Sequence, residues 1–215
     1  MPIANFLARQ LRKPSGWWGK FIMSRLLNAG NIAMNELTVQ QLALSTEPAI
    51  EATEKILEVG FGGGYLLGKI LDRPAVKFAV GLDFSPEMVD LARQRFRSFI
   101  EAGKLEIQCA SVENIPYADA SFTKICTVNT IYFWTDLKKA LAELERVLIR
   151  EGTLLLCFNS PAFLEQQGFT KRGFQAYDVD RVKHLLETLN FKNIAAISQK
   201  DTLREEFICI LAQKQ

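Results

Sequence analysis

The 215-residue sequence predicts an α/β fold, with a doubly wound, mostly parallel sheet of seven strands and an N-terminal helical cap. Two observations predict it. Short apolar runs alternate along the chain with segments whose apolar residues have helical spacing, which is the pattern of βαβ units with helices on both faces of a sheet. The last two apolar runs are joined by a short connection rather than a helix, so we expect an antiparallel pair at one edge of the sheet.

Each expected element has a local signal. The run over 76–83 is apolar almost throughout, as in a parallel strand buried on both faces. Ser85 suits an N-cap, Pro86 the first helical position and Glu87 the first turn. The expected strands cover residues 55–60, 76–83, 104–109, 123–128, 153–158, 194–198 and 206–212. The expected helices lie near residues 64–71, 86–99, 137–148 and 178–190, the third ending before Gly152.

Residues 1–53 differ in character from residues 54–215, because basic residues and aromatic residues are interleaved before the first acid, Glu36. We expect two domains: a cap of short helices over 1–53, docked by its aromatic faces on a main domain over 54–215. Two alternatives stay open for this segment, an organelle targeting sequence and a basic amphipathic contact with a membrane surface.

Composition limits the partners. The net charge of +2 and the pI of about 8.3 do not favour nucleic acid, and no apolar run reaches the roughly 20 residues that span a bilayer. The only histidine is His184, so no metal site is expected. None of the four cysteines forms a C-x-x-C pair, and each lies in an apolar run. We therefore expect reduced, buried thiols and a cytoplasmic protein.

The stretch LEVGFGGGYL has four glycines where the first strand meets the first helix. Ligands of open α/β sheets bind at this edge, and glycines let the backbone approach them closely. The spacing is G-x-G-x-G rather than the dinucleotide pattern G-x-G-x-x-G, because Tyr65 stands where the third glycine would fall. Glu58 interrupts an apolar strand and needs a partner such as a ligand ammonium. Asp83 ends the second strand, where a carboxylate can hold the ribose of an adenosine.

With these residues the sequence resembles the class I S-adenosylmethionine-dependent methyltransferases, on the branch of ubiquinone/menaquinone-biosynthesis and small-molecule enzymes. The resemblance covers about residues 54–212. The segments that carry it are ILEVGFGGG (56–64), VGLDFSPEMVDLAR (80–93), ASVENIPYADASF (110–122), VNTIYFW (128–134) and LERVLIREGTLLL (144–156). It implies the Rossmann-like methyltransferase fold, S-adenosylmethionine as cofactor and S-adenosylhomocysteine as product.

The resemblance also implies a role for particular residues. Gly60, Gly62 and Gly64 would line the methionine half of the cofactor, with Glu58 near its amino end and Asp83 on the ribose. The adenine would lie against Phe84 and Met88, its edge reached by Ser111, the Val112 backbone and, as a further candidate, Glu113, while Asn129 would sit beside the methionine portion. Many relatives have Asp where this chain has Ser111, which is a weaker, neutral acceptor for the adenine amino group.

The expected activity is methyl transfer by in-line displacement to a small, planar or apolar acceptor. Such chemistry needs positioning rather than a protein nucleophile, which agrees with the position of His184 on a late helix. Tyr132 and Trp134 are candidates for acceptor contact, pointing the same way if the backbone stays extended and leaves Phe133 for the core. The alternatives are a catalytically silent S-adenosylmethionine-binding protein and, third, an NAD(P)-dependent oxidoreductase.

Overall fold

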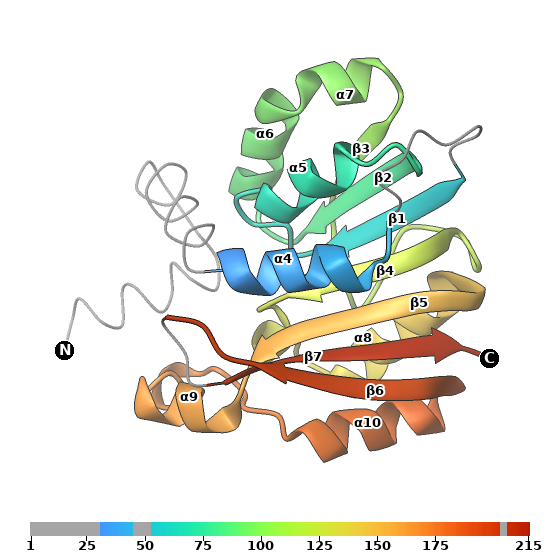
Figure 1. Ribbon diagram of the computed structural model, residues 1–215. Helices are drawn as coiled ribbons and strands as arrows, with labels where there is room; N and C mark the ends of the chain where they lie inside the picture. Colours follow the sequence, from blue (N-terminus) through green and yellow to red (C-terminus); the bar gives the residue numbers. More distant parts are fainter. Residues whose placement is uncertain (1–30, 45–52, 203–205) are drawn as a thin grey trace.

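The computed structural model of the protein describes residues 31–44, 53–202 and 206–215 (Figure 1). Its centre is a seven-stranded sheet in the order β3-β2-β1-β4-β5-β7-β6. The strands are β1 Glu54–Val59, β2 Val76–Asp83, β3 Leu105–Cys109, β4 Phe122–Val128, β5 Leu148–Asn159, β6 Phe191–Gln199 and β7 Phe207–Lys214. Strands β1 to β5 pair in parallel, and β7 runs antiparallel to both β5 and β6. The predicted mostly parallel sheet with an antiparallel pair at one edge is confirmed.

Helices cover both faces of the sheet. One apolar cluster packs α4, α5 and α6 against one face, and a second packs α8 and α10 against the other. The α-helices are α4 Ile32–Gln41, α5 Tyr65–Leu71, α6 Pro86–Arg95, α7 Arg97–Glu101, α8 Leu137–Val147, α9 Pro161–Gln166 and α10 Val179–Thr188. Two short 3-10 helices, η2 Ile131–Phe133 and η3 Thr170–Arg172, lie in the connections.

Most predicted elements are present, and two expected helix ends are wrong. The Ser85 side chain caps α6 by accepting from the Met88 backbone N–H at 3.4 Å, as its position predicted. The helix expected to run through to residue 99 breaks at Phe96, whose backbone leaves the helical region while its ring packs beside Gly68. Leu148 begins β5 instead of ending α8, because its backbone is extended and pairs with Phe122.

The described part of the N-terminal segment is α4, which lies across the sheet in front of β4 and β5 (Figure 1). Met34 and Leu42 are fully buried there, in the same apolar cluster as Leu155 of β5 and Cys209 of β7. The rest of the expected cap, with both alternatives for it, lies outside the described residues. Within the described ranges no helix is both long enough and apolar enough to cross a membrane.

Candidate functional site

The glycine loop after β1 has three glycines in left-handed conformations, with φ of 71° at Gly60, 49° at Gly62 and 72° at Gly64. A Cβ at Gly60 would lie 2.2 Å from Thr130 Cγ2, and one at Gly64 would lie 2.7 Å from the Phe96 ring. A Cβ at Gly62 would meet no atom of the described residues closer than 4.0 Å. Gly60 and Gly64 therefore leave room for neighbouring side chains of the protein. Gly62 faces open space, where a ligand could approach the backbone closely.

Asp83 ends β2, next to the glycine loop, and is buried. Its Oδ2 accepts from the Gly62 N–H at 3.1 Å, and its Oδ1 accepts from the Ser85 N–H at 2.9 Å. Burial raises the pKa of this carboxyl group, while the backbone N–H donors of Ser85, Gly62 and Phe84 oppose the rise. A carboxylate offers about four lone-pair sites, more than these three N–H donors fill, which leaves room for a ribose hydroxyl.

Glu58 lies in the middle of this region, on β1 and only 4% exposed. Its Oε2 atom is buried and has no hydrogen-bond partner among the described residues. Burial, and secondly the charge of Asp83, raise the pKa of Glu58 to about 8. A carboxyl group in this state is uncompensated when ionised. A cationic ligand group such as the ammonium of a methionine moiety would supply the missing partner.

The residues predicted for the adenine lie around Asp83 but differ in exposure. Phe84 is 41% exposed. Met88 and Val112 are buried, in the apolar clusters on the two opposite faces of the sheet. Ser111 is exposed and its Oγ accepts from the backbone N–H of Glu113 at 3.2 Å. The loop after β3 is joined to the site by the hydrogen bond from the Ala110 N–H to the Asp83 carbonyl at 3.1 Å.

Glu113 was a further candidate for contact with the adenine edge, and in the structure its carboxylate binds backbone groups of another loop. Its Oε1 accepts from the backbone N–H groups of Thr135 and Asp136, at 2.6 and 3.1 Å. It therefore holds the loop that leads into α8.

Asn129, which follows β4, is the centre of a polar network. Its Nδ2 donates to Asn31 Oδ1 at 2.7 Å and to Met34 Sδ at 3.2 Å, both from the start of α4. Its Oδ1 accepts from the Tyr132 hydroxyl at 2.7 Å and from Asn159 Nδ2 at 3.0 Å. The Tyr132 hydroxyl also accepts from the Asn159 backbone N–H.

Sequence reasoning missed Asn159 at the end of β5. The available signal was a polar residue that ends an apolar strand, as Asp83 and Asn129 do on β2 and β4. Since parallel strands end at the same sheet edge, all three belong to one crevice.

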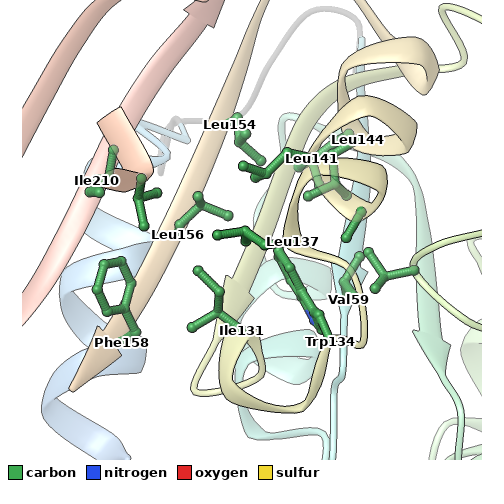
Figure 2. Packing of buried hydrophobic residues seen from close by; sticks show 14 of the residues in the cluster. Val59, Ile131, Trp134, Leu137, Leu141, Leu144, Leu154, Leu156, Phe158 and Ile210 are labelled. Atoms are coloured by element: carbon green, nitrogen blue, oxygen red, sulfur yellow. The ribbon is translucent and has the colours of Figure 1, made fainter. Parts of the chain in front are cut away.

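Tyr132 and Trp134 are both buried and belong to the core cluster on the α8 face. An extended backbone was the condition for these two side chains to point the same way, and it is not met, because residues 131–133 form η2. Trp134 packs beside Val59 and Leu137 (Figure 2). Phe133 is half-buried and meets the Phe174 ring edge-on, with centroids 4.7 Å apart. Acceptor contact by Tyr132 or Trp134 stays a prediction.

Comparison with known proteins agrees with this geometry. Residues 57–156 match the family model described as "Methyltransferase domain". The chain is 30% identical over 143 residues to "Ubiquinone/menaquinone biosynthesis C-methyltransferase UbiE" of Citrifermentans bemidjiense, a match that covers 65% of this chain and 58% of that relative. The chain therefore spans less than two thirds of that relative's length.

Solved structures share the fold. The YcgJ protein of Bacillus subtilis superposes with a TM-score of 0.68 at 16% identity, covering 86% of this chain and 99% of that one. Geranyl diphosphate C-methyltransferase of Streptomyces coelicolor, solved with S-adenosyl-L-homocysteine, superposes with a TM-score of 0.71 at 11% identity, covering 96% and 88%. Residues 57–156 thus resemble a methyltransferase domain in sequence, and at identities of 11–16% these solved structures show that the chain shares their fold.

Proposed function

We propose that the protein transfers a methyl group from S-adenosylmethionine to a small-molecule acceptor. One observation carries the proposal: the open position at Gly62 is bonded to the buried Asp83 carboxylate, whose charge also acts on the buried Glu58, and Oε2 of Glu58 has no partner among the described residues. Hydroxyl donors suit Asp83, and a cation suits Glu58. An adenosyl group joined to an amino acid has both, so the residues fit this cofactor.

When bound, S-adenosylmethionine supplies an electrophilic methyl group on its sulfonium. The protein would bind and orient it: Gly62 would permit close backbone approach, Asp83 would accept from the ribose hydroxyls, and Glu58 would receive the methionine ammonium. The exposed ring of Phe84, next to Asp83 in the chain, offers an apolar face to the adenine. Asn129, which follows β4 at the same sheet edge, would lie beside the methionine portion.

The protein's contribution to the rate is positioning. Holding donor and acceptor in line lowers the barrier by roughly 7–11 kcal/mol without a covalent protein nucleophile. His184 has no part in this, since its side chain is 75% exposed on α10 beside Glu187. The acceptor molecule must then supply the nucleophile, an O, N, S or C atom that attacks the methyl group.

The acceptor is a planar or apolar small molecule rather than a nucleic acid. Support comes from the aromatic segment around Tyr132 and Trp134 next to Asn129, and from relatives and neighbours that are named as enzymes of quinone biosynthesis and of geranyl diphosphate methylation. The setting we propose is the cytoplasm, because Cys126, Cys157 and Cys209 are buried free thiols. The expectation that all four thiols are buried is wrong for Cys109, which ends β3 and is exposed.

Calorimetry with S-adenosylmethionine, S-adenosylhomocysteine and NADH tests the proposal. We expect both sulfur compounds to bind and NADH to fail, and we expect label from [methyl-³H]S-adenosylmethionine to appear in a component of fractionated cell extract. Binding of NADH alone would assign the protein to the oxidoreductases. Binding of the sulfur compounds without label transfer to any fraction would favour the silent binding protein.

A further inference from the structure

We infer that the side-chain oxygen of Asn159 receives a hydrogen bond from an O–H or N–H group of the methyl acceptor, and so selects acceptors that carry a hydroxyl or an amine. This inference rests on the proposed function. Asn159 ends β5, is only 7% exposed, and its Oδ1 is buried with no hydrogen-bond partner in the described ranges.

The orientation of the Asn159 carboxamide follows from its neighbours. The Tyr132 hydroxyl accepts from the Asn159 backbone N–H, so its single hydrogen is available for Asn129 Oδ1, 2.7 Å away. Asn159 Nδ2 donates to the same Asn129 oxygen at 3.0 Å. Turning the Asn159 carboxamide over would place two oxygens against each other. The unpartnered atom is therefore the acceptor oxygen and not the amide nitrogen.

Asn129 is itself held from the other side. Its Nδ2 donates to Asn31 Oδ1 at 2.7 Å, and Asn31, although it precedes α4 in the N-cap position, makes no side-chain cap bond to that helix. The network thus joins the ends of β4 and β5 to the start of α4 and keeps Asn159 in one orientation. A fixed, buried acceptor is a specificity element, because only a ligand with a matching donor compensates it.

The position of Asn159 favours the acceptor over the cofactor as its partner. The strand order places β2, β1, β4 and β5 side by side. Asp83 on β2 marks the adenosine end of the cofactor and Gly62 after β1 marks its middle. Asn159 on β5 lies two strands beyond β1, on the far side of Asn129. A donor that reaches Asn159 therefore comes from the molecule on the other side of the transferred methyl group.

The groups that touch the network are carboxamides, a phenol and a thioether. Such uncharged partners suit a neutral donor, a phenol-type or alcohol hydroxyl or an aromatic amine. An acceptor whose edge has only ether oxygens or tertiary nitrogens would leave Asn159 Oδ1 unpaired and is disfavoured.

The experiment titrates the full chain, saturated with S-adenosylhomocysteine, with two matched pairs of probes: phenol against anisole, and aniline against N,N-dimethylaniline. We expect at least one donor probe to bind, and to bind about tenfold more tightly than its methylated partner. Asn159→Leu, similar in volume, should abolish the preference. Asn159→Ala, which removes the same oxygen with a smaller side chain, should abolish the preference as well, and Gln199→Leu, exposed on β6, is the control for loss of a distant carboxamide.

The outcomes are distinct. Failure of the parent to bind S-adenosylhomocysteine refutes the proposed function itself. If the cofactor product binds, the inference is overturned when no donor probe binds, when each pair binds equally, or when Asn159→Leu keeps the preference, which would leave an internal water as the partner of Asn159. Should Asn159→Leu fail to fold, retention of the preference in a folded Asn159→Ala variant overturns it equally.

Discussion

The backbone N–H of Gly62 donates to the Asp83 carboxylate at 3.1 Å, so the acid that ends β2 also holds the glycine loop that follows β1. The second carboxylate oxygen holds the backbone of Ser85 at 2.9 Å, at the start of α6. Asp83 therefore shapes the loop, and in the proposed function it would also accept hydrogen bonds from the cofactor. A substitution that removes the whole side chain cannot separate these roles.

Asp83→Asn can keep one of the two hydrogen bonds that hold the backbone, whereas Asp83→Ala loses both. The Asp83→Asn variant keeps one oxygen but loses the charge and one acceptor, and a charge-assisted hydrogen bond contributes about 1.5–3 kcal/mol. We expect the Kd for S-adenosylhomocysteine, measured by calorimetry, to rise about tenfold or more, and further in Asp83→Ala. Asp90→Asn, exposed on α6, is the matched control. Undiminished affinity in Asp83→Asn would show that the cofactor is not bound where we place it.

Gly62→Val should abolish cofactor binding with a modest loss of stability. The left-handed backbone of position 62 costs a side-chain-bearing residue about 1–2 kcal/mol, and a Cβ there points into open space. Gly60→Ala should destabilise more, because its Cβ would lie 2.2 Å from Thr130 Cγ2. Thermal unfolding of the two variants, alongside calorimetry, checks the contrast. If Gly62→Val were the less stable of the two, the glycine would serve the turn and not the ligand.

The contrast between these glycines marks the limit of what the sequence could predict. The cluster, its place after a strand and the acids at Glu58 and Asp83 were visible in the residues alone. Which glycine serves which purpose depends on Thr130 and Phe96, which lie far along the chain and meet the loop only in the folded protein.

The backbone of the turn after β4 could not be predicted for a similar reason. An aromatic run is compatible with an extended chain, but the N–H of Phe133 bonds to the Thr130 carbonyl, and the Tyr132 carbonyl accepts from Gln175. The last contact comes from the segment before α10. The network of Asn31, Asn129 and Asn159 likewise joins three segments that are far apart in the chain, so no local sequence pattern predicts it.

The pKa of Glu58 predicts a pH dependence. Its folded value of about 8 exceeds the ordinary 4.5, so the unfolded chain loses this proton first as pH rises. The free energy of unfolding should therefore be greatest below pH 4.5 with respect to this group and should fall by a few kcal/mol up to about pH 8. The raised pKa of Asp83 acts in the same direction. Urea unfolding of Glu58→Gln should show a shallower decline, and an unchanged slope would contradict the assignment.

Cofactor binding should report on the same carboxyl group. An ammonium beside Glu58 favours its ionised form, so binding of S-adenosylhomocysteine near pH 7 should release a proton. Calorimetry in buffers of different ionisation enthalpy measures that release, and Glu58→Gln should reduce it. Equal proton release by parent and variant would mean that the ammonium lies elsewhere.

Helix α4 should behave as part of the core. Leu42 is fully buried just beyond the end of this helix, and truncation of such a leucine costs about 2–5 kcal/mol. Leu42→Ala should therefore lower the free energy of unfolding by that amount in a single transition. Ile32→Ala, at a position 43% exposed, should change it by less than about 0.5 kcal/mol. A separate early transition in Leu42→Ala would instead make the segment before β1 an independent cap.

Trp134 and Tyr132, adjacent to the same crevice, should respond differently to substitution. Trp134 packs in the core beside Val59 and Leu137 (Figure 2), so Trp134→Ala should cost about 3–5 kcal/mol in urea unfolding. Tyr132→Phe keeps the ring but removes the hydroxyl that contacts Asn129 and Asn159. We expect it to impair methyl transfer to an acceptor identified by labelled-methyl screening, while the affinity for S-adenosylhomocysteine changes less than about threefold, a difference of under 1 kcal/mol. Trp134→Phe, which retains an aromatic ring, is the milder packing control. Equal losses of cofactor and acceptor binding in Tyr132→Phe would assign the hydroxyl to the general support of the crevice, and the acceptor would then have to contact other residues.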